Sequence, residues 1–104
     1  MYAVIFEVDV KPENKNEYLA IAAELRKELA HLEGFISIER FESLATPGKL
    51  LSLSFWESEA AIKSWKQNTL HKEAQTKGRA SIFNDYRIRV AQVERDYTLE
   101  TSKL

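Results

Sequence analysis

Three features of the 104-residue sequence predict a single α+β domain. Apolar and polar residues alternate along four segments, as in half-buried β-strands, and recur at three- and four-residue steps along two long segments, as in amphipathic helices. The order is strand, helix, strand, strand, helix, strand. With right-handed crossovers, this order gives an antiparallel four-stranded sheet with both helices on one face, the ferredoxin-like βαββαβ plan.

The first strand and the first helix are indicated by a change of periodicity near residue 11. The row of the strand that should face the helices consists of Val4, Phe6, Val8 and Val10. Pro12 suits a first helical turn, and an apolar stripe with helical spacing then runs from Tyr18 to Leu32. Gly34 can adopt the left-handed conformation found just beyond helices, so we expect the helix to end before it.

A β-hairpin is expected next. Residues 35–42 are typical of a second strand and residues 50–56 of a third, with Thr46-Pro47-Gly48 as the turn between them. The last residue of the third strand, Trp56, shares its row with two serines. We therefore expect Trp56 on the face of the sheet that the helices leave uncovered.

The rest of the chain supplies the second helix and the last strand. Ser58 can cap a helix that runs to about Asn68, and a shorter helix should follow from His71 to Gly78. Residues 86–95 alternate again as the last strand, whose Tyr86 should face the helices. The domain should span residues 1–97, with a polar tail at 98–104.

The uncovered face of the sheet should form a homodimer. Opposite charges from the first and last strands should pair across it, with Glu7 near Arg87 and Arg89. The apolar residues expected on the same face are Ile5, Phe41, Trp56 and Val93. So much apolar surface favours a twofold partner over contact with solvent.

Composition excludes several classes of function. A net charge of −1 gives no electrostatic case for binding nucleic acid or an anionic membrane. The chain has no cysteine, which excludes disulfides and thiolate chemistry. No apolar stretch approaches the roughly 20 residues of a membrane span, and MYAVIFEVDV lacks the features of a signal peptide. We expect a soluble, cytoplasmic protein.

The chain resembles a known family in its plan, its length and two stretches, FWESEAAIKSWKQNTLHKEAQTKGR and YRIRVAQVERDY. Over residues 1–97 it is similar to the antibiotic biosynthesis monooxygenase family of dimeric α+β barrel proteins. This family includes cofactor-free oxygenases of polyphenols, quinol oxidases and haem-degrading enzymes. The resemblance implies a pocket in each protomer, between the helices and the sheet.

Three residues are candidates for catalysis. His71 would open the short helix, where the positive end of the dipole favours a neutral imidazole that can accept a proton. Arg79 could turn inward to hold an anion, and Tyr86 should point from the sheet toward the helices. Each has a structural alternative, since His71 could be an exposed or capping residue and Arg79 a surface residue.

Four further residues are candidates for substrate binding. They are Phe6, Trp65, Asn68 and Gln75. Trp65 lies on the inward stripe of the second helix, where it could pack in the core or stack on a flat ring. The sequence has no glycine-rich phosphate loop and no spacing of metal ligands, so we expect neither a cofactor nor a metal.

The resemblance implies an oxygenase, and together with these residues it favours a monooxygenase that needs no cofactor. An electron-rich phenol, once deprotonated, can itself pass an electron to dioxygen, so the protein need only remove a proton, stabilise the anion and exclude water. The expected partners are a small aromatic substrate of the quinol or polyphenol type, dioxygen and a second copy of the chain.

Two alternatives remain within the same fold. A haem-degrading member is expected to carry an asparagine on the first strand and a histidine ten residues after the tryptophan of the second helix. This chain has Phe6 and Glu7 on that strand and Gln75 ten residues after Trp65, which disfavours haem chemistry. The other alternative is a dimer that binds or senses a small aromatic molecule without catalysis.

Overall fold

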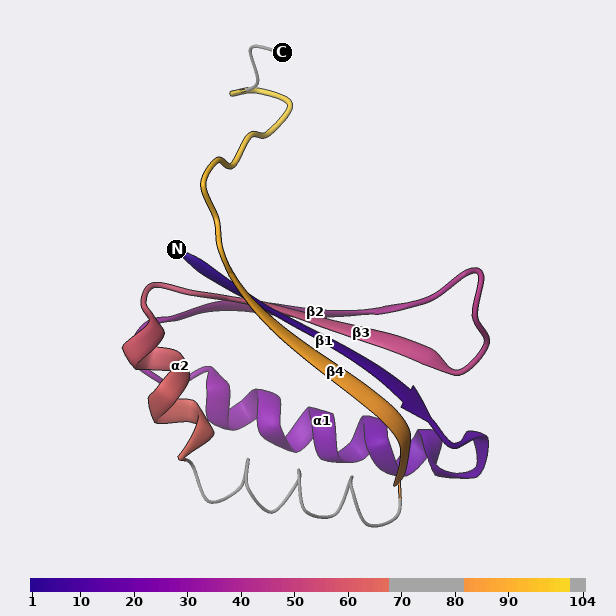
Figure 1. The fold of residues 1–104 in the computed structure, drawn as a ribbon. Helices are drawn as coiled ribbons and strands as arrows, with labels where there is room; N and C mark the ends of the chain where they lie inside the picture. Colours follow the sequence, from indigo (N-terminus) through magenta and orange to yellow (C-terminus); the bar gives the residue numbers. More distant parts are fainter. Residues whose placement is uncertain (68–81, 102–104) are drawn as a thin grey trace.

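The computed structural model describes residues 1–67 and 82–101, and the predicted α+β plan is confirmed (Figure 1). The elements in chain order are β1 (Tyr2–Val10), the 3-10 turn η1 (Pro12–Asn14), α1 (Lys15–Leu29), β2 (Phe35–Glu42), β3 (Lys49–Trp56), α2 (Glu59–Lys66) and β4 (Phe83–Gln92). The strands form one antiparallel sheet in the order β2-β3-β1-β4. Both helices lie on the same face of this sheet.

Local residues explain where α1 ends and where α2 begins. Gly34 has a φ of 84°, which places it in the left-handed region just beyond α1, as expected. The cap of α2 is Ser58, whose Oγ accepts a hydrogen bond of 3.2 Å from the backbone N–H of Ala61. The helix predicted from His71 to Gly78 lies outside the described residues.

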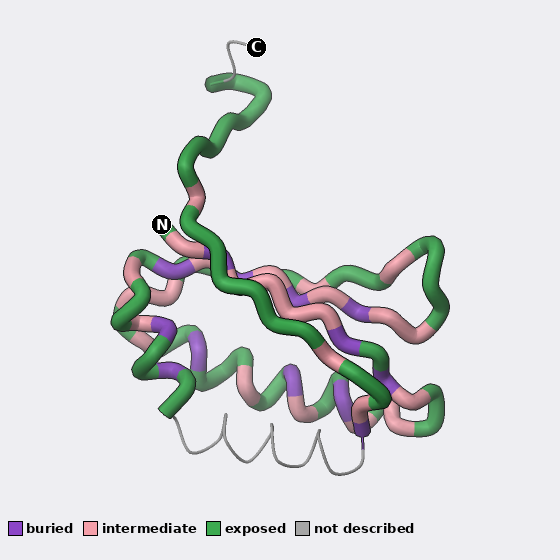
Figure 2. The backbone as a smooth tube through the Cα atoms, in the orientation of Figure 1, coloured by how far each residue is buried: buried purple, intermediate pink, exposed green. Residues whose placement is uncertain are grey.

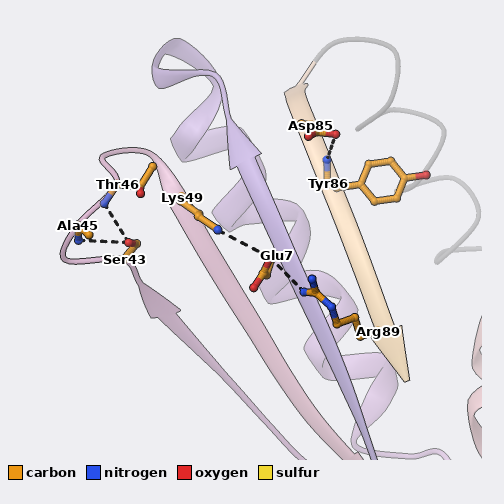
Figure 3. Close-up of polar contacts among 8 residues, drawn as sticks. All are labelled: Glu7, Ser43, Ala45, Thr46, Lys49, Asp85, Tyr86 and Arg89. Carbon is orange, nitrogen blue, oxygen red and sulfur yellow. Dashed lines mark hydrogen bonds and ion pairs between the residues drawn. The ribbon is translucent and has the colours of Figure 1, made fainter. Parts of the chain in front are cut away.

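The β2–β3 connection is ordered by a serine. Ser43 Oγ accepts hydrogen bonds from the backbone N–H groups of Ala45, at 3.2 Å, and Thr46, at 3.0 Å (Figure 3). Gly48 then completes the turn with a φ of 82°. The predicted hairpin is therefore present, and its turn residues provide the hydrogen bonds and the positive φ that reverse the chain.

The last strand differs in its bounds from the sequence prediction of residues 86–95. β4 starts at Phe83, which pairs with Val10. The register shifts between Asp9 and Val10, so Asn84 forms an irregularity that interrupts the alternation and hides this start from the sequence pattern. It ends at Gln92 because β1 begins at Tyr2; the last pairing bond there runs from Val93 N–H to the Met1 carbonyl, at 2.9 Å. Most of β4 is exposed (Figure 2).

The prediction for Trp56 was wrong. This residue is only 1% exposed and lies on the helix-covered face, where its ring packs edge-on against Phe35 at 5.3 Å. Its indole N–H donates to Ser54 Oγ at 2.9 Å. The serines of β3 are thus buried under the helices, and the row that faces away from them is the apolar one, Leu51, Leu53 and Phe55. Small polar residues were mistaken for a solvent-facing row.

The outer face of the sheet combines this apolar row with charged residues. Glu7 lies between Lys49 and Arg89, with Oε2 at 3.7 Å from Lys49 Nζ and 3.4 Å from Arg89 Nη1 (Figure 3). The expected pairing of opposite charges between the first and last strands is therefore present. Ile5 pairs with Leu53 across β1 and β3 on this face, as predicted for Ile5.

Two glycines with positive φ allow a matched test of packing between α2 and the start of β2. A Cβ at Gly34 would lie 2.6 Å from Ala61 Cβ, whereas at Gly48 the nearest atom would be 3.5 Å away. Both alanine variants should lose about 1–2 kcal/mol from the left-handed backbone. Gly34→Ala should lose about 1–3 kcal/mol more because α2 must shift. Urea denaturation measures both, and equal losses would show that the contact with Ala61 does not restrict residue 34.

Candidate active site

The helix-facing residues of β3 determine which parts of the space between the sheet and the helices are filled by side chains. This row consists of Leu50, Ser52, Ser54 and Trp56. Leu50 belongs to a buried cluster with Val8 and Tyr18 at one end of the sheet. Trp56 belongs to a second cluster, with Ile62 and Trp65, at the other end. The two serines between them are too short to reach the helices.

A cavity of about 140 Å³ lies beneath the helices. The sheet contributes Val4 and Phe6, α1 contributes Tyr18 and Leu25, and α2 contributes Ile62 and Trp65; Ser52 and Ser54 line it as well. An engineered apolar cavity of similar volume is known to hold one benzene molecule. This site therefore has the size and the lining for a single ring.

Aromatic side chains form one wall of the cavity. Phe6 and Phe83 both line it, with their ring centroids 6.0 Å apart in an edge-to-face arrangement. Tyr86 packs against both rings, at 5.9 Å from Phe6 and 6.1 Å from Phe83. Tyr86 is not among the described residues that line the cavity, so it contacts the aromatic wall without lining the cavity itself.

The cavity also contains a charged residue that the sequence analysis did not single out. Arg40 of β2 lines the cavity opposite Ser52 in the strand register. Its Nε is buried and has no hydrogen-bond partner in the described structure. The other charged residue of the described lining is Lys66, which is itself exposed. The sequence shows only that a basic residue alternates with Ile38; the pairing with Ser52 that places it on the covered side is seen in the structure.

The structure describes three of the seven predicted site residues. Phe6 and Trp65 line the cavity, and Trp65 is 8% exposed, so its ring serves the core and the cavity at once. Tyr86 lies beside them, as described above. The other four, Asn68, His71, Gln75 and Arg79, fall outside the described residues, so their roles remain predictions.

Neither a metal site nor a membrane span is found in the described parts of the chain. Within residues 1–67 and 82–101, no three histidine, aspartate or glutamate side chains come together in a way that could hold a metal ion. The helices described here are too short or too polar to cross a bilayer.

Comparison with known proteins identifies the family. Residues 1–77 match the family model described as "Antibiotic biosynthesis monooxygenase". The chain belongs to this family. It is 47% identical over 93 residues to "Jasmonate monooxygenase ABM" of Pyricularia oryzae, which covers 89% of this chain but 43% of that protein. It is also 36% identical over 94 residues to the uncharacterized protein YqjZ of Bacillus subtilis, which covers 90% of this chain and 80% of that protein.

Solved structures show the same fold. Rv0793 from Mycobacterium tuberculosis superposes with a TM-score of 0.83 at 14% identity, covering 93% of this chain and 98% of that one. A conserved protein from Methanosarcina mazei Go1 gives 0.80 at 22% identity, covering 88% and 90%. The ferredoxin-like fold is thus shared with proteins of very different sequence.

Filling the space above the serines tests the cavity directly. Ser52→Leu should place an isobutyl group in the cavity and abolish binding of benzene as an apolar probe, whereas Ser52→Ala should retain it. Binding is measured by the rise in melting temperature and by chemical-shift changes of the cavity-lining residues. If Ser52→Leu binds benzene as well as the parent protein does, the probe binds elsewhere.

Proposed function

We propose that this protein is a monooxygenase that acts on a small, electron-rich aromatic molecule of the quinol or polyphenol type and uses no cofactor. The observation that carries the proposal is the apolar cavity between the helices and the sheet, with Phe6 and Trp65 in its walls. Membership of the family and the 47% identity to a protein named as a monooxygenase support the reaction type. The chain spans less than half the length of that relative, so its activity here is part of the proposal.

The volume of the cavity narrows the substrate. At about 140 Å³ it matches one six-membered ring better than a fused polycyclic system. We therefore expect single-ring quinols to bind more readily than tricyclic anthrones. The cavity-lining residues of β1 are Val4 and Phe6, and neither provides the asparagine amide expected of a haem-degrading member.

The proposed reaction uses the substrate as the source of electrons. Loss of the phenol proton gives a phenolate, which transfers one electron to dioxygen to form a phenoxyl radical and superoxide. The radicals join at a ring carbon that carries hydrogen, and protonation gives a hydroperoxide. Elimination of water leaves one oxygen atom on the ring as a carbonyl. The substrate thus becomes a quinone, and its two lost hydrogen atoms leave in the water molecule.

The protein would contribute a base, a partner for the anion and a dry site. In this proposal His71 accepts the phenol proton and Arg79 stabilises the anion, whereas Tyr86, which does not line the described cavity, supports the rings of Phe6 and Phe83. Trp65 and Phe6 hold the ring, while Asn68 and Gln75 offer further polar contacts. Apolar walls favour the reaction because they exclude water, which would otherwise solvate the phenolate and hold its electron more tightly.

We also propose that the chain forms a homodimer through the outer face of the sheet. The apolar side chains of this face include Ile5, Leu51, Leu53 and Phe55, and Phe41 is 43% exposed beside them. The described helices cover only the opposite face. A second copy would remove this apolar surface from water, which is the usual driving force for such association.

Oxygen uptake tests the catalytic proposal. A panel should contain single-ring quinols, an anthrone and, because of the relative's name, jasmonate. His71→Ala should abolish any uptake while changing the free energy of unfolding by less than about 0.5 kcal/mol. Trp65→Ala should lower that free energy by about 3–5 kcal/mol because it truncates a buried side chain.

Two outcomes would contradict this assignment. Turnover that survives His71→Ala would show that His71 is not the base. A loss of stability in His71→Ala as large as that in Trp65→Ala would give His71 a structural role. Saturable binding of the quinols without oxygen uptake would favour the alternative of a binding protein without catalysis.

A charge on the outer face tests the dimer. Leu53→Glu or Val93→Glu should convert a dimer into monomers, because an unpaired carboxylate would be buried at the interface. Leu19→Glu, on a 41% exposed residue of α1, is the matched control and should leave the dimer intact. Sedimentation equilibrium at micromolar concentration measures the mass, and a monomeric parent protein would refute the dimer.

A further inference from the structure

We propose that Arg40 is a carboxylate-binding residue and that the natural ligand of the cavity is a small apolar acid, with a ring held in the cavity and one carboxylate held at β2. The inference deepens the proposed function by naming the class of its substrate. It rests on that function only in taking the same cavity as the binding site. It concerns binding, so it can be tested whether or not a reaction is found.

The burial of Arg40 Nε is the first observation. Guanidinium groups have five N–H donors and no acceptor, and they stay protonated in proteins. A buried donor without a partner loses its hydrogen bonds to water and gains nothing in exchange. Within residues 1–67 and 82–101, Arg40 Nε is such a donor, and Arg40 lines a mainly apolar cavity. A ligand that brings an acceptor would remove this cost.

The neighbours of Arg40 are the second observation. Arg40 is opposite Ser52 and Ile38 is opposite Ser54 in the β2–β3 register, so both serines lie next to the arginine row. Ser54 Oγ already accepts from the Trp56 indole N–H at 2.9 Å, which leaves the hydroxyl hydrogen of Ser54 free to be donated. The polar strip of the cavity thus offers mainly donors, as an anion requires.

The charge of the lining is the third observation. The charged residues of the described lining are Arg40 and Lys66, and both are positive. A carboxylate suits the planar fork of arginine because two parallel hydrogen bonds can form at once. The volume, about 140 Å³, leaves space for little more than one ring or a short branched chain. A single-ring phenol that carries one carboxylate meets both requirements and keeps the phenol group that the proposed reaction needs.

Benzoate and benzamide are matched probes for this inference, because they share shape and differ in charge. At pH 7, isothermal titration should show the parent protein binding benzoate about 10- to 100-fold more tightly than benzamide, the range expected for charge-assisted hydrogen bonds. Arg40→Met should remove this preference and keep the affinity for benzamide. Lys66→Met, at the other lining cation, should retain the preference.

The stability of the ligand-free variants separates binding from a structural role. Because Arg40 Nε has no hydrogen-bond partner among the described residues, Arg40→Met should melt at the same temperature as the parent protein or higher. If Arg40 supported the fold, Arg40→Met would melt at a lower temperature. Arg40→Lys keeps the charge without the fork, and its preference for benzoate should be intermediate.

Several results would overturn the inference. They are undetectable binding of benzoate, equal affinities for the two probes in the parent protein, an equal loss of preference in Arg40→Met and Lys66→Met, and a lower melting temperature for Arg40→Met. The first two need no variant, so they decide the question even if Arg40→Met does not fold. Benzoate binding by a protein that takes up no oxygen would support this inference and count against the proposed reaction alone.

Discussion

The site depends on the sizes of four side chains in one strand. In the helix-facing row of β3, Leu50 and Trp56 at the two ends reach the helices, and the serines between them do not. Protein interiors are otherwise packed as closely as organic crystals, so an opening of about 140 Å³ needs a specific cause. The two buried clusters hold the helices away from the sheet, and the short residues between them leave the space.

The same row explains why polar groups occur in an apolar cavity. A serine is small, but its hydroxyl must be satisfied when it is buried. Ser54 meets this requirement through the Trp56 indole, which in turn fixes the tryptophan in the second cluster. Packing and recognition therefore share residues here. Trp65 has a similar double role on the helix side, since its ring is buried in the core and also lines the cavity.

Periodicity predicted the described strands and the two described helices, and their order in the chain. It also predicted the helix-facing residues of β1 and β4, because the residues of an alternating strand fall into only two rows, one on each face of the sheet. It failed on β3, where both rows carry apolar residues and the choice of phase rested on two serines. The start of β4 was missed because the irregularity at Asn84 interrupts the alternation.

The candidate site was predicted only in part, for a related reason. Large aromatic residues with the correct phase, such as Phe6 and Trp65, can be assigned to an interior wall from sequence. Arg40 could not, because a charged residue in an edge strand is usually solvated. Only the register shows that Arg40 is opposite Ser52 on the covered side. Positions that violate the usual pattern are often the functional ones, which is why a ligand is proposed at Arg40.

The N-terminus of α2 is tied to the start of β2 by several contacts. Glu57 N–H donates to the Gly34 carbonyl at 2.8 Å, Ser58 caps the first turn, and Ala61 leaves no room for a Cβ at Gly34. A tilt of α2 would therefore pivot about its N-terminus. Its eight residues span about 12 Å, so a tilt of about 10° about that point displaces the other end by about 2 Å. Trp65 is near the C-terminus of α2, so the cavity wall that contains Trp65 is the part that a small tilt would move most.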